Sequence, residues 1–109
     1  MTIANEIIIE ATVGKDKELK PLLNDLVASV LNEKGCQKFE LYQRFDERSH
    51  FFIIEIWKSN KAYEKHLNNE VYKDKILNID AFSTSQVTHA LKLTQCLTEL
   101  GLKAKQEKK

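Results

Sequence analysis

The sequence has few residues that break or cross-link a chain. It contains one proline, three glycines and one tryptophan in 109 residues, so it is neither collagen-like nor a low-complexity segment. Its two cysteines, Cys36 and Cys96, stand far apart and outside any CxxC motif, which excludes a disulfide-stapled scaffold and predicts free thiols. Because His50, His66 and His89 show no ligand spacing such as HxxxH, we predict no bound metal.

A strong net charge and a long apolar run are also missing. The formal net charge of +1 gives no field that would attract nucleic acid or an acidic membrane. No apolar run approaches the roughly 18 residues that a membrane-spanning helix needs. The first ten residues contain two acids and no basic n-region, so they resemble a strand rather than a secretion signal. We therefore expect a cytoplasmic protein that binds neither nucleic acid nor a membrane.

Apolar periodicity in the first half predicts strand, helix and strand. Alternation predicts a strand over residues 6–13, with Ile7, Ile9, Ala11 and Val13 on one face. Leucines at helical spacing predict a helix over 17–33, with Pro21 in its first turn. Gly35 suits the residue just past its end. A second strand is expected over 36–45, with Phe39, Leu41 and Phe45 on one face.

The second half predicts a central strand, an interrupted helix and a last strand. Residues 51–57 are apolar on both faces, which is typical of a strand covered above and below. Ser59 can cap the helix that follows, and Asn68 and Asn69 interrupt it before a second short helical piece. The last strand is expected over 85–93. We expect one domain over residues 1–95 and a partly disordered extension over 96–109, because its last seven residues are too polar to pack.

The predicted order is βαββαβ, an α+β arrangement with a four-stranded antiparallel sheet. In such units the first and third strands lie centrally, flanked by the fourth and second. Two helices cover only one face of the sheet, yet the other face carries Ile8 and one side of residues 51–57. A second copy of the chain is the simplest cover for that face, so we expect a homodimer through the open sheet face.

Several short segments together resemble one family. They are Glu33-Lys34-Gly35-Cys36, Phe39-Glu40-Leu41-Tyr42, Glu55-Ile56-Trp57-Lys58-Ser59, then Ala62 and His66-Leu67. Their order and spacing resemble the antibiotic biosynthesis monooxygenase family over about residues 3–95. The resemblance implies a ferredoxin-like fold with two sheets packed into a dimeric α/β barrel. It also implies oxidation of an aromatic hydroquinone by O₂ without flavin, haem or metal, so the expected ligands are a small aromatic substrate and O₂, and no cofactor.

His66 is the residue most suited to start such a reaction. An imidazole with an ordinary pKa near 6.5 accepts a proton at neutral pH. A hydroquinone gives an electron to O₂ far more readily as an anion, so a positioned base can replace a cofactor. The family's helix histidine falls at this position. The alternative is a helix-face histidine bonded to backbone, and from the residues alone that alternative is favoured.

Three further side chains are candidates for substrate binding. Trp57 can stack on an aromatic ring, although a core tryptophan is the simpler reading. Tyr63 lies one helical turn before His66 and can bond a substrate oxygen or pack the helix edge. Glu55 shares a strand face with Trp57, and a buried carboxylate must be paired or protonated. It can orient His66, but an ion pair across the sheet with Lys38 or Arg44 is the preferred reading.

Three function classes fit these residues. The first is a cofactor-free monooxygenase acting on a hydroquinone or polycyclic phenol, with His66 as base. The second is an isomerase or other acid–base enzyme acting on a small carbonyl compound in the same pocket without O₂. The third is a non-catalytic dimeric binding module, in which His66 and Trp57 only pack.

Overall fold

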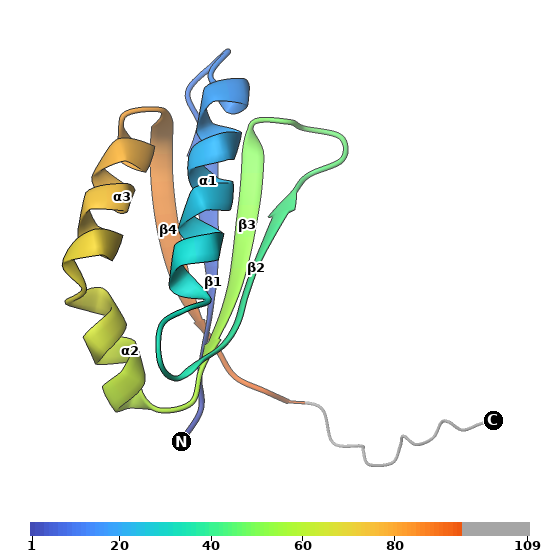
Figure 1. Ribbon diagram of the computed structural model, residues 1–109. Coiled ribbons are helices and arrows are strands. Elements are labelled where there is room, and N and C mark those ends of the chain that lie inside the picture. The colour runs from blue at the N-terminus through green and yellow to red at the C-terminus, as the bar shows by residue number, and fades with distance from the viewer. Residues whose placement is uncertain (95–109) are drawn as a thin grey trace.

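The computed structural model describes residues 1–94 and consists of one four-stranded sheet with helices on one side (Figure 1). The strands run antiparallel in the order β2-β3-β1-β4, so the first and third strands are central, as predicted. The elements in chain order are β1 (Ile3–Ala11), α1 (Asp16–Val30), β2 (Cys36–Gln43), β3 (His50–Trp57), α2 (Asn60–Leu67), α3 (Glu70–Asp80) and β4 (Ser83–Leu91). This is the expected ferredoxin-like βαββαβ fold, with its second helical region in two pieces.

The helix boundaries follow from local capping. The Ser59 hydroxyl accepts the backbone N–H of Ala62 at 3.1 Å and starts α2. The Asn69 side chain accepts the N–H of Tyr72 at 3.1 Å and starts α3, which explains the predicted interruption. Pro21 lies inside α1 rather than in its first turn, because α1 already begins at Asp16. Proline has no N–H to donate to the carbonyl oxygen one helical turn before it. Because Pro21 is exposed, water can bond to that oxygen instead.

The core lies between the helices and the inner face of the sheet. Twelve apolar residues are buried there: Ile7, Ile9, Ala11, Leu19, Leu23, Leu26, Val30, Phe39, Phe51, Ile53, Trp57 and Ile79. The alternation along β3 places Phe51, Ile53 and Trp57 inward, and Glu55 shares their face. Full burial of each large apolar side chain contributes about 1.5–3 kcal/mol to folding.

Two apolar residues expected in the core lie in turns instead. Val13 is 93% exposed because β1 ends at Ala11 and a turn through Gly14, with φ +77°, follows. Phe45 is fully exposed because β2 ends at Gln43. Alternation continues through both positions in the sequence, but strand pairing stops before them. The last strand is likewise shifted two residues earlier than predicted.

The outer face of the sheet carries apolar side chains that no helix of the described residues covers. Paired rows across the strands place Tyr42, Phe52, Ile8 and Val87 side by side, and Ile56, Ala4 and Leu91 in a parallel row. Tyr42, Val87 and Leu91 are 51%, 44% and 42% exposed, although large apolar side chains are usually shielded from water. All three helices lie on the opposite side (Figure 1).

No helix within residues 1–94 is long and apolar enough to cross a membrane. The predicted extension over 96–109, including Cys96, lies outside the described residues.

Candidate active site

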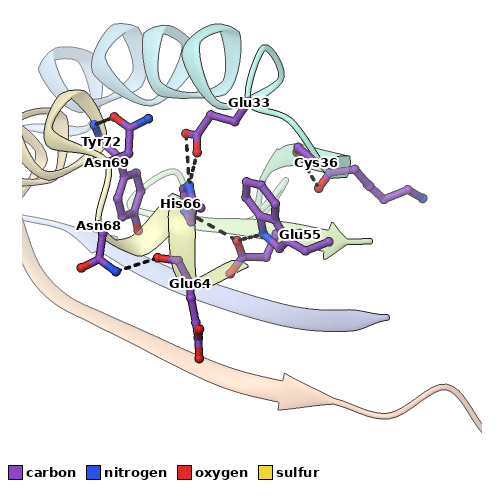
Figure 2. A network of polar contacts seen from close by, with 10 residues as sticks. Glu33, Cys36, Glu55, Glu64, His66, Asn68, Asn69 and Tyr72 are labelled. Atoms are coloured by element: carbon purple, nitrogen blue, oxygen red, sulfur yellow. Dashed lines mark hydrogen bonds and ion pairs between the residues drawn. The ribbon is translucent and has the colours of Figure 1, made fainter. Parts of the chain in front are cut away.

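His66 is buried near the carboxyl end of α2, with 1% of its surface exposed. Its Nδ1 lies 3.1 Å from both carboxylate oxygens of Glu33, which follows the end of α1 (Figure 2). A carboxylate in this position favours the tautomer that carries the proton on Nδ1, because Nδ1–H can then donate to it. The Glu33 side chain is 14% exposed, so the contact lies at the edge of the core.

The other ring nitrogen of His66 has no such partner. Among the buried side-chain nitrogens and oxygens of the described residues, only His66 Nε2 lacks a hydrogen-bond partner. The nearest carboxylate oxygen, Oε1 of Glu55, lies 4.0 Å away, within reach of an ion pair but too far for a hydrogen bond. A buried polar atom without a partner in the protein is rare, and catalysis is one of the roles that explain it.

Glu55 is held by two neutral donors. Its Oε1 accepts Trp57 Nε1–H at 2.7 Å, and its Oε2 accepts the side-chain amide of Asn5 at 3.0 Å. The predicted ion pair across the sheet is wrong. Lys38 lies 3.8 Å from Glu40 and Arg44 lies 2.8 Å from Asp46, both on the exposed surface. The side chain of Glu55 instead points inward, toward His66, because alternation along β3 places it on the helix side.

Aromatic rings surround the imidazole. The ring centroids of Tyr72 and Trp57 lie 3.9 and 4.4 Å from that of His66. The rings of Tyr63 and Phe39 lie farther away, at 6.2 and 6.3 Å. Tyr63 and Tyr72 are partly exposed, whereas His66, Trp57 and Phe39 are buried.

Burial and the nearby carboxylates hold the neighbouring acids in their neutral forms. Burial, and then the charge of Glu55, raises the pKa of the Tyr72 phenol well above its ordinary value. The same causes raise the pKa of the Tyr63 phenol. Burial, and then the charge of Glu33, raises the pKa of the Cys36 thiol, which makes the thiol less reactive.

The structure brings together the four predicted site residues, His66, Trp57, Tyr63 and Glu55. It adds three residues that sequence reasoning missed as site residues: Glu33, Asn5 and Tyr72. A signal existed for two of them. Asn5 is a polar residue on the otherwise apolar inner face of β1, and Glu33 opens the Glu-Lys-Gly-Cys segment. Tyr72 lies beside His66 because of the turn between α2 and α3, and the sequence alone does not give the geometry of that turn.

Two surface clefts adjoin this cluster. One, of about 300 Å³, is lined by Glu33, Lys34, Ala62, Lys65 and Asn69. The other, of about 250 Å³, is lined by Lys34, Gly35, Lys58, Ser59, Lys61, Ala62 and Lys65. Neither of these two clefts is lined by His66, and among the described side chains that contact His66, Glu33 alone lines one of the two. Within residues 1–94, no group of three or more His, Cys, Asp or Glu side chains is arranged to hold a metal ion.

The sequence profile of antibiotic biosynthesis monooxygenases matches residues 2–76 of this chain, which includes all seven of these residues. The chain belongs to the antibiotic biosynthesis monooxygenase family. The predicted kinship is therefore confirmed. No curated protein matches the chain in sequence.

Solved structures of this family and of related proteins share the fold. PA3566 from Pseudomonas aeruginosa is 26% identical, with a TM-score of 0.79 over 86% of this chain and 95% of its own. SnoaB from Streptomyces nogalater, a cofactor-independent oxygenase, is 15% identical, with a TM-score of 0.80 over 90% of this chain and 98% of its own. Rv0793 from Mycobacterium tuberculosis is 17% identical, with a TM-score of 0.79 over 90% of this chain and all of its own. At these identities, SnoaB and Rv0793 bear on the fold alone.

Proposed function

We propose that this antibiotic biosynthesis monooxygenase family member is a cofactor-free monooxygenase that oxidises a hydroquinone or polycyclic phenol with O₂. The observation that carries the proposal is the pair of environments around His66. One ring nitrogen is fixed by Glu33, while the other is buried among aromatic rings without a hydrogen-bond partner in the described residues. Membership of the antibiotic biosynthesis monooxygenase family supports this class of reaction, and the cofactor-independent oxygenase SnoaB is an example of such chemistry on the same fold.

In this mechanism His66 acts as the general base. With its Nδ1–H donated to Glu33, the lone pair of Nε2 is available to accept the proton of a phenolic hydroxyl. Glu33, and Glu55 at 4.0 Å, then stabilise the imidazolium that forms. The resulting phenolate can pass an electron to O₂, the step that a cofactor would otherwise mediate.

The aromatic side chains supply the substrate contacts in this proposal. Trp57 offers a ring for offset stacking, and Glu55 fixes that ring through the 2.7 Å bond to its indole N–H. Tyr63 offers a hydroxyl, which burial keeps protonated and able to donate. We place the route of a substrate toward Nε2 beside Tyr63 and Tyr72, the two partly exposed residues of the aromatic cluster.

The test measures O₂ uptake with a panel of chemically reduced hydroquinones. His66→Ala should lower the rate by roughly 10²–10⁴-fold, the usual contribution of a general base. His50→Ala is the matched control, because His50 contacts Glu10 at the start of β3 and should leave the rate unchanged. An unchanged rate for His66→Ala removes His66 from the mechanism. Turnover that persists without O₂ identifies an acid–base enzyme instead, and no turnover with any compound favours a binding module.

We also propose a homodimer through the outer sheet face. Its apolar rows lie on the side of the sheet that no described helix covers, and an exposed apolar patch of this kind commonly marks an interface. A second sheet packed against it would complete the dimeric barrel that the family resemblance implies. Cytoplasmic location stays a prediction from the sequence.

A further inference from the structure

Four lysines line the 250 Å³ cleft beside the start of α2. Lys34 comes from the α1–β2 connection, Lys58 from the end of β3, and Lys61 and Lys65 from successive turns of α2. Three chain segments therefore converge on one cleft with four ammonium groups. Since the whole chain carries a net charge of only +1, this positive charge is a local feature rather than a property of the surface as a whole.

No acidic side chain of the described residues offsets these lysines. Among the other lysines of residues 1–94, Lys38, Lys73 and Lys75 form ion pairs with Glu40, Glu70 and Asp25, whereas Lys15, Lys17, Lys20 and Lys92 form none. Lys34, Lys58, Lys61 and Lys65 form none within residues 1–94, and no carboxylate of that range lines their cleft. Glu33 lines only the neighbouring cleft, and its carboxylate faces His66. An anion bound in this cleft would be attracted by positive side chains from several sides.

The base of the cleft is held at fixed geometry. Gly35 adopts φ +89°, and a Cβ at its position would lie 2.5 Å from the Cβ of Ala62, so the connection and α2 are in close contact. The backbone N–H of Lys58 donates to the Gly35 carbonyl at 2.8 Å. These contacts fix the backbone from which the four lysines extend. A ligand that binds here therefore needs to order little of the backbone, which lowers the entropic cost of binding.

We propose that this cleft binds a small organic molecule carrying a compact group with two or more negative charges, a phosphate or a polycarboxylate. Lysine ammonium groups act as point charges suited to phosphate oxygens. The two clefts share Lys34, Ala62 and Lys65, so a ligand longer than the first cleft would extend toward Glu33. The inference goes beyond the proposed function, because it concerns binding alone and does not depend on His66 acting as a base.

The test is a titration of the ¹⁵N-labelled full-length chain with inorganic pyrophosphate and, in parallel, with citrate at constant ionic strength. We expect saturable shifts of the backbone amides of Gly35 and of residues 58–62. Saturation by pyrophosphate alone identifies a phosphate site, and saturation by citrate alone a carboxylate site. Saturation by both supports the shared chemistry. Shifts that grow linearly without saturation, or that appear at lysines over the whole surface, overturn the proposal.

Charge reversal locates the site. Lys61→Glu should weaken binding by at least about tenfold, because it replaces an attraction with a repulsion at short range. Lys34→Glu, in the α1–β2 connection, should weaken binding likewise, and it keeps the test valid if Lys61→Glu fails to fold. Lys20→Glu makes the same change in net charge at an exposed position of α1 away from the cleft, and should weaken binding much less. Equal weakening by all three variants would mean non-specific attraction and would refute the site.

Discussion

The imidazole of His66 and the carboxylate of Glu33, 33 residues apart in the chain, lie 3.1 Å apart at the junction of α1, α2 and the inner sheet face. The contact joins a residue that follows the end of α1 to a residue in the last turn of α2. It determines which nitrogen of His66 faces the aromatic cluster. The chemistry proposed for Nε2 therefore depends on a residue at the edge of the core.

Removing Glu33 should affect both stability and turnover. Glu33→Ala leaves Nδ1 of the buried His66 without its acceptor, so we expect a loss of about 1–3 kcal/mol in the free energy of unfolding. Glu33→Gln keeps an acceptor oxygen but removes the charge that stabilises the imidazolium. It should cost less stability and still lower the rate of O₂ uptake by about tenfold or more. Urea denaturation and oxygen-electrode assays measure the two effects.

Glu64→Gln is the matched control for the Glu33 variants. Glu64 is an exposed residue of the same helix as His66 and contacts only Asn60 through its side chain among the described residues. We expect the free energy of unfolding of Glu64→Gln to stay within about 0.5 kcal/mol of that of the parent. If Glu33→Ala were as mild as Glu64→Gln, the contact with His66 would contribute nothing to the fold.

A side chain at position 35 should be poorly tolerated. Gly35→Ala combines a left-handed backbone conformation with a clash against Ala62, so we expect a loss of about 2–4 kcal/mol in unfolding free energy. Gly14→Ala is the control, because its φ of +77° is equally left-handed but open space surrounds it. That variant should lose only about 1–2 kcal/mol, the cost of the conformation itself.

The double variant Gly35→Ala/Ala62→Gly separates the two costs. Removing the Ala62 methyl relieves the clash but leaves the strained conformation. The double variant should therefore be more stable than the sum of the single changes predicts, by about 1 kcal/mol or more in a double-mutant cycle. Simple additivity would show that the two segments move apart and that the cleft floor is not rigid.

The stability of the protein should fall in alkaline solution because of Tyr72. Its pKa is raised in the folded state, so above about pH 10, where an ordinary tyrosine ionises, the unfolded chain loses a proton that the folded chain keeps. The folded state then binds more protons than the unfolded state. The free energy of unfolding therefore decreases with rising pH, by up to about 1.4 kcal/mol per pH unit for one such group.

Tyr72→Phe tests this cause directly. Urea midpoints from pH 9 to 11 should fall less steeply in the variant than in the parent. Tyr63→Phe should also flatten the curve, because burial raises the pKa of the Tyr63 phenol in the folded state. Parallel curves for the parent and Tyr72→Phe would assign the alkaline loss to other groups.

The outer sheet face should mediate self-association. Light scattering after gel filtration should give twice the chain mass of 12.6 kDa. Ile54→Lys should give a monomer, because Ile54 lies on a central strand of this face, between Glu6 and Glu40. Those acids can pair with an introduced lysine, so the monomer should stay folded. Val13→Lys, at an exposed turn position, should remain a dimer, and a monomeric parent would refute the interface.

Strand and helix order could be predicted because periodicity reports local geometry. The apolar residues on both faces of β3 predicted that this strand is central. Ser59 and the pair Asn68–Asn69 predicted the boundaries of α2 and α3. The ends were less accurate because alternation continues through Val13 and Phe45 after backbone pairing has stopped. The prediction that Pro21 lies in the first turn of the helix was wrong. An exposed position in the second turn tolerates a missing N–H, whereas a buried position would not.

The site was only partly predictable. The candidate residues come from one short stretch, 55–66, in which spacing along β3 and α2 predicts proximity. Their partners come from other elements. Asn5 reaches Glu55 because β1 pairs with β3, and Glu33 reaches His66 because the close contact at Gly35 brings the end of α1 against α2. The preferred ion pair of Glu55 with Lys38 or Arg44 was wrong because sequence alone leaves both faces of β3 equally apolar.

By itself, the sequence determined the βαββαβ order, the central strands, the family and the set of residues able to carry acid–base chemistry. Those features depend on local periodicity and on residue types, which are written in the chain. Only the tertiary structure decided that Glu55 faces the helices, that Glu33 holds His66, and that four lysines with no ion pair in residues 1–94 share one cleft. Such relationships join residues far apart in the chain, 33 positions for Glu33 and His66, and their geometry exists only once the sheet has formed and the helices have packed on it.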